Sequence, residues 1–189
     1  MILFLTNADT EILALRSVVE GLPEEFPPVR AANPVNLDES PSLDGVQVVV
    51  VRLLGGRRSW EAPFDALRAA CVARRIPLVA LSGESVPDAE LATLSTAEPA
   101  VVARSFDYLA QGGLANTANL LQYLAGHPHE PPVEVPATGL WPTRAVRVGD
   151  DAPVIGVVFY RAHLLSGNTG FVDDLCAAIE DRGGRAVPV

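Results

Sequence analysis

The sequence contains no lysine, and positive charge is scarce throughout. Its 189 residues hold 14 basic residues, all arginine, against 23 acidic ones, which gives a net charge of −9. Such an acidic chain is unsuited to non-specific binding of nucleic acid or of an anionic membrane surface. The missing lysine excludes a phosphate-binding P-loop, and no G-x-G-x-x-G pattern occurs either. We therefore expect neither nucleic acid nor a membrane as a partner.

Cysteine, metal-ligand clusters and long apolar runs are also lacking. Cys71 and Cys176 are far apart on apolar helical patterns, so we expect buried, reduced thiols. No apolar run approaches the roughly 18 residues of a transmembrane helix, and the apolar start lacks the basic residues of a signal peptide. His127 and His129 flank a proline with no third ligand nearby. These absences predict a cytoplasmic protein that binds no cofactor or metal of its own.

What is present, in residues 1–125, is an alternation of apolar runs and helical patterns. Continuous apolar runs are typical of strands that are buried on both faces of a parallel sheet. Spacings of three and four between apolar residues indicate helices between those runs. The order predicts an α/β domain with a flavodoxin-like open parallel sheet and helices on both faces. The expected strands are residues 2–5, 29–32, 46–54 and 78–81, and the expected helices are residues 12–22, 59–71, 87–94, 101–110 and 114–124.

A proline-rich stretch separates this domain from a second, shorter unit. Residues 126–152 include five prolines and show almost no periodicity, which is typical of a linker. Residues 153–189 then begin with an apolar run, continue through a polar loop and a helical pattern, and end in another apolar run. This is the first strand–helix–strand of a second α/β domain. We therefore expect the chain to be the front piece of a larger protein.

Polar side chains follow the predicted strands, where ligands bind in open α/β sheets. After the first strand, Thr6, Asn7, Asp9 and Thr10 are typical helix-capping residues. A phosphate-binding loop would contain more glycine, serine and threonine, and here Asp9 occupies the position that an anion would take. We interpret this loop as a helix cap.

Three arginines lie in or just after the end of the third strand. Arg52 ends a run of four valines, and Arg57 and Arg58 follow two glycines. An arginine offers a planar fork of donors to a carboxylate, so this stretch is a candidate carboxylate-binding site. The alternative is that Arg57 and Arg58 are solvated, while Arg52 pairs with an acid such as Glu84 after the fourth strand.

The loop at residues 160–170 contains the remaining candidates. Arg161 could bind a carboxylate, and His163 could ligate a metal or shuttle a proton, although a lone histidine is more often a hydrogen-bonded loop residue. Asn168 or Thr169 is expected to cap the following helix. No nucleophile elbow G-x-S-x-G occurs, so nothing specific indicates a hydrolase.

Five segments together carry a family resemblance, and they occur in the expected order. The chain resembles the large subunit of aerobic cobaltochelatase, the CobN family, which is related to the H subunit of magnesium chelatase. The likeness extends over nearly all of the chain and is weakest across residues 127–151. The segments are I-L-F-L-T-N-A-D-T, V-V-V-R-L-L-G-G-R-R-S-W, P-D-A-E-L-A-T-L-S-T, Y-L-A-Q-G-G-L-A-N-T-A-N-L and V-I-G-V-V-F-Y-R-A-H-L-L-S-G-N-T-G-F-V-D-D-L-C.

The resemblance implies a role in cobalamin biosynthesis. Members of this family insert Co(II) into hydrogenobyrinic acid a,c-diamide, and two smaller AAA+ ATPase subunits hydrolyse Mg-ATP to drive the insertion. The large subunit holds the tetrapyrrole and the metal. Family members are several times longer than this chain, and their metal-binding residues lie further along. The resemblance thus implies an N-terminal portion with no catalytic residue of its own, inactive as a fragment.

Two functions of different classes follow from these expectations. In the first, a group of polar residues lines or approaches the tetrapyrrole cleft, because the substrate carries carboxylates and amides around a flat apolar ring. In the second, the acidic first domain is a docking module for the ATPase subunits and does not touch the ring. A free-standing small-molecule binding protein is a third, weaker interpretation. The residues of the first hypothesis are Arg52, Arg57, Arg58, Arg161, His163, Asn168 and Thr169.

Overall fold

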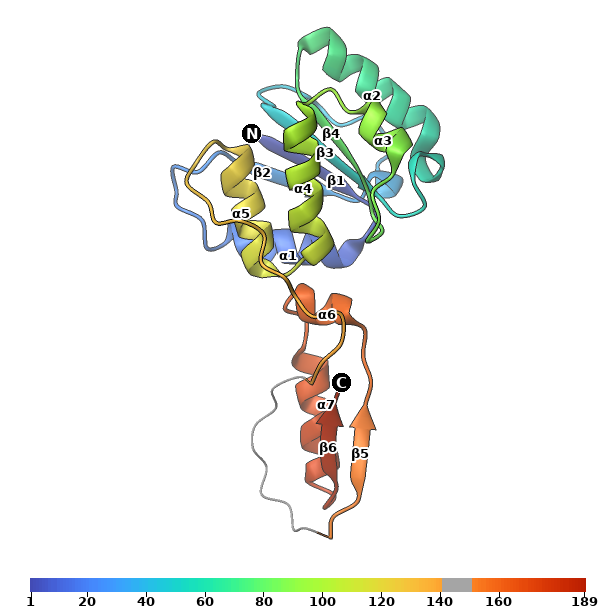
Figure 1. Cartoon of the computed structure of the whole chain (residues 1–189), viewed down its shortest axis with the longest axis vertical. Helices are drawn as coiled ribbons and strands as arrows, with labels where there is room; N and C mark the ends of the chain where they lie inside the picture. The colour runs from blue at the N-terminus through green and yellow to red at the C-terminus, as the bar shows by residue number, and fades with distance from the viewer. Residues whose placement is uncertain (141–150) are drawn as a thin grey trace.

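The computed structural model describes residues 1–140 and 151–189 and contains two units (Figure 1). The first unit is built on a four-stranded sheet and the second on a two-stranded sheet. A short helix, α6 (Arg161–Leu165), lies at the junction between them and contacts α1 (Asp9–Val19) of the first unit. Residues from both units therefore meet at one place, beside α6.

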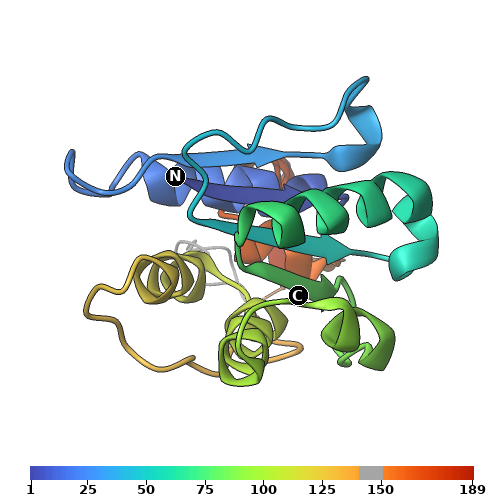
Figure 2. The same cartoon turned by 90° about the horizontal axis from the view of Figure 1, so that it is seen from above.

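The four-stranded sheet is entirely parallel, with the order β2-β1-β3-β4 (Figure 2). The residues of β1, β3 and β4 are all buried, as expected for continuous apolar runs that are covered on both faces. The edge strand β2 is only partly buried. The strands are β1 (Ile2–Thr6), β2 (Val29–Ala32), β3 (Val48–Leu53) and β4 (Leu78–Ser82).

Helices pack on both faces of this sheet and divide its core in two. One apolar cluster joins Phe64 and Leu91 to one face, and the other joins Leu15, Tyr108 and Leu120 to the opposite face. The expected α/β fold with helices on both faces is confirmed. The first face carries α2 (Glu61–Arg74) and α3 (Ala89–Leu94), and the second carries α1, α4 (Pro99–Gln111) and α5 (Leu114–Leu124). Two short 3-10 helices, η1 (Pro34–Asn36) and η2 (Arg57–Trp60), lie in the connections between these elements.

The second unit is a parallel strand–helix–strand motif, as the sequence predicted. β5 (Val154–Val157) pairs with β6 (Arg185–Pro188), and α7 (Gly170–Glu180) connects them. Its core is small, consisting of four buried residues with two partly buried neighbours. The helix α6 was not expected, because residues 160–170 had been interpreted as a loop. Its single short turn is too brief to produce a helical apolar period.

The described part of the proline-rich connection, residues 126–140, has no helix or strand, yet it is held to the first unit. The side chain of Asn116 donates to the carbonyl of Val133 at 2.8 Å and accepts from its N–H at 2.8 Å. Asn119 accepts from the N–H of Glu130 at 2.8 Å, and the hydroxyl of Tyr108 donates to the carbonyl of Glu130. Side chains of α4 and α5 thus form hydrogen bonds with backbone groups of the connection that have no partner in a helix or sheet. Residues 141–150 of the predicted linker lie outside the described residues.

Both cysteines are buried and unpaired, as predicted. Burial raises the pKa of the Cys71 thiol, and it also raises the pKa of the Cys176 thiol. Both are therefore unreactive in the folded protein at neutral pH. Within residues 1–140 and 151–189, no helix has the length and apolar character needed to cross a membrane.

Candidate functional site

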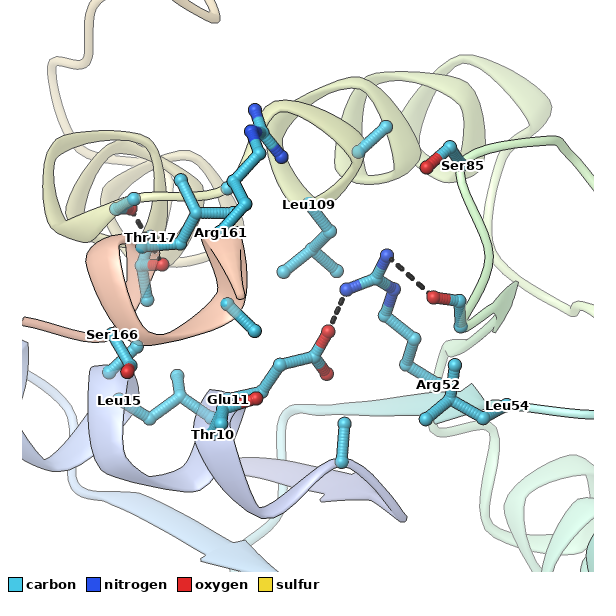
Figure 3. A pocket seen from close by; sticks show the side chains of 18 of the residues that line it. Thr10, Glu11, Leu15, Arg52, Leu54, Ser85, Leu109, Thr117, Arg161 and Ser166 are labelled. Carbon is cyan, nitrogen blue, oxygen red and sulfur yellow. Dashed lines mark hydrogen bonds and ion pairs between the residues drawn. The ribbon is translucent and has the colours of Figure 1, made fainter. Parts of the chain in front are cut away.

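A cavity of about 260 Å³ lies where the two units meet, at the carboxyl ends of the strands of the first sheet (Figure 3). In open α/β sheets this edge is the usual place for a ligand. The first unit contributes residues from β1, α1, β3, α4, α5 and the loop after β4, and the second contributes residues of α6. The polar side chains in its wall are Thr10, Glu11, Arg52, Ser85, Thr117, Arg161 and Ser166.

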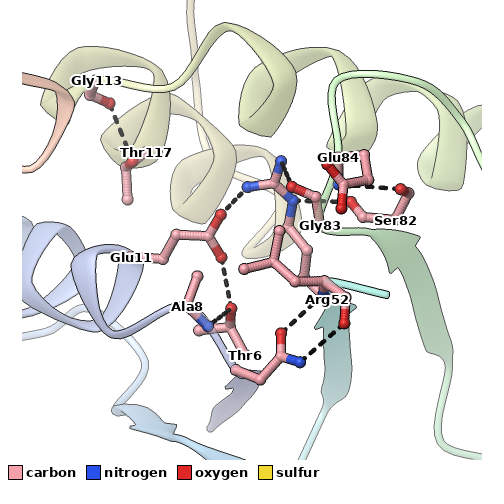
Figure 4. Close-up of polar contacts among 11 residues, drawn as sticks. Thr6, Ala8, Glu11, Arg52, Ser82, Gly83, Glu84, Gly113 and Thr117 are labelled. Carbon is pink, nitrogen blue, oxygen red and sulfur yellow. Dashed lines mark hydrogen bonds and ion pairs between the residues drawn. The ribbon is translucent and has the colours of Figure 1, made fainter. Parts of the chain in front are cut away.

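Arg52 is the central polar residue of this cavity, and it is 6% exposed at the end of β3. Its Nε donates to the carbonyl of Ser82 at 3.0 Å, and Nη2 donates to the carbonyl of Gly83 at 3.2 Å. Nη1 forms an ion pair with Glu11, in the first turn of α1 (Figure 4). The expectation of an acidic partner was right, but the partner in contact is Glu11, whereas Glu84 acts only through its charge. Burial lowers the pKa of Arg52 to about 10, and the negative charge of Glu84 opposes that change, so Arg52 stays charged at neutral pH.

The loop after β1 positions Glu11. The hydroxyl of Thr6 donates to Glu11 Oε2 at 2.6 Å and accepts from the N–H of Ala8 at 3.1 Å. Asp9 accepts instead from the side chain of Asn33 at 2.9 Å, and α1 has no side-chain N-cap. The interpretation of this loop as a helix cap is therefore wrong for α1. Its polar residues fix the ion pair and the neighbouring loops.

Arg161 lines the same cavity, but its guanidinium points away from Arg52 (Figure 3). Nε donates to the carbonyl of Pro136 at 2.9 Å. Nη2 donates to the carbonyls of Gln111 at 2.9 Å and Val135 at 2.7 Å. One charged side chain from α6 therefore joins the end of α4 to the anchored connection, which fixes the orientation of the second unit at this point.

A close backbone approach completes the junction. Gly112 has a φ of 69°, and a Cβ placed there would lie 2.8 Å from Cδ1 of Leu165. Glycine at position 112 therefore adopts a positive φ without strain and leaves the space that α6 occupies. The sequence indicated this glycine only as a break between two helices.

A second cavity, of about 390 Å³, lies beside the first and is mostly apolar. It opens at the carboxyl ends of β5 and β6, where Val158 is 84% exposed. Arg161 lines both cavities. This cavity was not predicted from the sequence, although the apolar run that begins at Val154 continues past the end of β5 to Phe159. Its lining residues are Val135, Pro136, Ala137, Thr138, Gly139, Leu140, Val158, Phe159, Arg161, Leu164 and Val189.

Arg57 and Arg58 lie outside both cavities. Arg57 donates to both carboxylate oxygens of Asp65, at 3.0 and 2.5 Å, and to Glu61 at 2.8 Å. Its hydrogen bonds to Asp65 raise the pKa of Arg57 and lower the pKa of that carboxyl. Arg57 thus binds carboxylates as its chemistry predicts, but they belong to its own chain. Arg58 is exposed.

The three candidates after Arg161 also lie outside the cavities. The ring of His163 packs edge-on against Phe171 at a centroid distance of 4.9 Å. Its buried Nδ1 has no hydrogen-bond partner among the described residues. Thr169 occupies the N-cap position of α7 without a side-chain cap bond, and Asn168 is exposed. No three potential metal ligands come together within the described ranges. The structure thus brings Arg52 and Arg161 to one cavity, and the substrate-binding role of all seven residues stays a prediction.

Comparison with known proteins agrees with the resemblance seen in the sequence motifs. Residues 106–189 match the family model described as CobN/Magnesium Chelatase. The whole chain is similar to the aerobic cobaltochelatase subunit CobN of Pseudomonas aeruginosa, with 26% identity over 211 residues, and to that of Sinorhizobium sp, with 30% identity over 218 residues. The chain spans 17% of the length of each of these relatives.

A solved structure shows the same likeness in three dimensions. The catalytic subunit of cobaltochelatase from Mycobacterium tuberculosis superimposes with a TM-score of 0.72 and 35% identity, over 99% of this chain and 16% of that one. The fold of both units is thus shared with a portion of a cobaltochelatase subunit. The resemblance to the CobN cobaltochelatase subunits is therefore confirmed along the whole chain.

Proposed function

We propose that this chain forms part of the tetrapyrrole-holding subunit of a cobaltochelatase. The observation that carries the proposal is similarity over the whole chain to cobaltochelatase subunits, with 35% identity and a TM-score of 0.72 to a solved one. The chain corresponds to only 16% of that structure, so the insertion step is not assigned to any residue described above. Its proposed contribution, as an N-terminal portion of the subunit, is to hold the substrate.

The substrate of the proposed enzyme is hydrogenobyrinic acid a,c-diamide, a flat ring with polar side groups. The 390 Å³ cavity supports this choice as a contact for one edge of the ring, because its lining is mostly apolar and includes the exposed Val158. Arg161 lies at the border of this cavity, and its guanidinium already donates hydrogen bonds to three backbone carbonyls. Such a fixed group loses little further freedom when a ligand binds, which favours affinity.

The proposal includes two smaller AAA+ partner subunits that hydrolyse Mg-ATP in the cytoplasm. Insertion of Co(II) requires the loss of the inner N–H proton of the ring and distortion of the ring. A conformational cycle that is driven by ATP hydrolysis can supply that work. The junction at α6 is where such a cycle would change the relative position of the two units.

The test is a cobalt-insertion assay in extracts of cells that carry Arg161→Ala in the native gene. We expect a raised KM for the tetrapyrrole, because the border of the apolar cavity loses its fixed side chain. Arg104→Ala is the matched control, since Arg104 is an exposed arginine of α4 outside the cavities described above. An unchanged KM, or equal insertion in extracts of cells without the gene, would refute the proposal.

A second candidate function, docking of the ATPase subunits, is favoured by one feature. A groove of about 490 Å³ lies between α3 and α4, with Val102 and Phe106 in its floor and Asp88 and Asp107 at its polar positions. A pull-down of purified ATPase subunits by the whole chain tests this function. If Phe106→Glu abolishes capture and leaves the KM for the tetrapyrrole unchanged, docking is the function of this groove. Capture that is insensitive to Phe106→Glu would exclude it.

A further inference from the structure

The Arg52–Glu11 pair faces a cavity whose shape and donor set suit a particular chemical group. We propose that the 260 Å³ cavity between the two units is a binding site for a primary carboxamide. The group would lie against the ion pair, with its oxygen on Arg52 and its NH₂ on Glu11. Both side chains border the cavity from its first-unit side (Figure 3).

Arg52 supplies the donor half of this site. A guanidinium has five N–H groups, and three of them donate to Ser82, Gly83 and Glu11. The other two form no hydrogen bond with the described part of the chain. The side chain is 8% exposed, so it is already desolvated, and its three bonds fix its direction. A ligand carbonyl in the cavity would receive a charge-assisted hydrogen bond from a donor that is already in place.

Glu11 supplies the acceptor half. Each carboxylate oxygen has two lone pairs, and each uses one, toward Arg52 on one side and Thr6 on the other. The Glu11 side chain is 20% exposed, which leaves part of the carboxylate open to the cavity. It can therefore accept a hydrogen bond from a ligand NH₂ without giving up the ion pair.

The pairing of a fixed donor with a fixed acceptor discriminates among ligands. A carboxylate would gain from Arg52 but meet the negative charge of Glu11 and, beyond it, that of Glu84. A primary amide is neutral, and it presents an acceptor and a donor side by side. It is the group that satisfies both partners without a charge conflict.

The remaining walls suit the carbon stem that carries such a group. Leu15, Leu109 and Leu165 line the cavity from three different helices. Its volume of about 260 Å³ accommodates several water molecules or one short side arm, but not a macrocycle. We therefore assign the cavity to a single amide-bearing arm. That this arm belongs to the tetrapyrrole rests on the proposed function, whereas recognition of the amide does not.

The first test is an NMR titration of the 189-residue chain with propionamide and with propionate. We expect propionamide to shift the Arg52 Nε–H resonance and the backbone amide of Gly113, with affinity about tenfold higher than that of propionate, since one charge-assisted hydrogen bond is worth that much. Equal affinities, or shifts confined to other parts of the protein, would overturn the proposal. This test needs no tetrapyrrole, so it can fail or succeed independently of the proposed function.

Two variants sharpen the result. Glu11→Gln removes the negative charge, so the preference for propionamide over propionate should fall to parity or reverse. Ala162→Phe fills the cavity from an exposed position on α6 and should abolish binding of propionamide, whereas the matched control Ala73→Phe, at an exposed position on α2, should not. If Glu11→Gln fails to fold, the Ala162→Phe and Ala73→Phe pair decides. An unchanged preference in Glu11→Gln, or equal binding by the two phenylalanine variants, contradicts the assignment.

Discussion

The two units of this chain use the same parallel strand–helix–strand motif but differ in how completely it is covered. In the first unit, β1 and β3 have neighbours on both edges and helices on both faces, and both strands are fully buried. In the second, β5 and β6 pair only with each other, and three of the four residues of β5 are exposed. Phe171 and Leu175 of α7 are about half exposed as well. Within these 189 residues, the first unit therefore carries most of the stability, and the second leaves more of its apolar surface exposed.

The largest expected contrast comes from two phenylalanines. Phe64→Ala empties a fully buried position in α2 and should lower the free energy of unfolding by about 4 kcal/mol. Phe171→Ala, at a position that is 47% exposed, should lower it by less than about 1 kcal/mol. Urea unfolding followed by circular dichroism measures both. Similar losses in the two variants would show that the second unit is as tightly packed as the first.

Hydrogen exchange should show the next largest difference. Amides of β3 can exchange only by global unfolding, because the strand is buried at the centre of the sheet. Amides of β6 belong to a two-stranded sheet and should exchange roughly a hundredfold faster through local opening. Mass spectrometry of exchanged peptides compares the two strands directly. Equal protection would contradict the comparison.

An intermediate effect is expected at the buried ion pair. Arg52→Met leaves Glu11 without its partner and should cost about 2 kcal/mol of stability, less than for a fully buried pair because Glu11 is 20% exposed. The double variant Arg52→Met with Glu11→Leu should recover most of that loss, since neither charge then remains unpaired. Thermal unfolding of both proteins provides the measurement. If the double variant is less stable than Arg52→Met, the loss in Arg52→Met does not come from an unpaired Glu11, and the ion pair itself stabilises the fold.

The smallest effect is expected at Gly112 in the junction, for which Gly126, after the end of α5, is a matched control. Gly112 and Gly126 both have positive φ, at 69° and 73°, but only at Gly112 would a Cβ meet Leu165. Alanine should cost about 1 kcal/mol at either position because of the backbone. Only Gly112→Ala should also increase proteolysis between the units, because it displaces α6. Equal cleavage of the two variants would show that α6 is not seated on Gly112.

The sequence predicted the fold well where burial dominates. Residues 2–5, 46–54 and 78–81 were recognisable as strands because both of their faces are apolar, which only a covered parallel strand permits. The sequence did not predict the details that depend on particular hydrogen bonds. Ser59, at the start of the predicted helix 59–71, is a typical capping residue, but its hydroxyl donates to the carbonyl of Gly56, and α2 has no side-chain cap.

The candidate site was predicted in part, for a similar reason. The cost of burying a charge at the end of a strand correctly indicated that Arg52 has an acidic partner. Which acid it contacts depends on where α1 begins, and the helix starts earlier than its apolar spacing suggested. The role of Arg161 at the junction could not be predicted, because its acceptors are backbone carbonyls that any sequence supplies.

Direct binding of the ring tests the proposal that this chain holds part of a tetrapyrrole. The measurement is a titration of the purified chain with hydrogenobyrinic acid a,c-diamide, followed by the absorption spectrum of the ring. We expect saturable one-to-one binding that Arg161→Ala weakens and Arg104→Ala leaves unchanged. An unperturbed spectrum, or binding that is equal in all three proteins, would contradict it.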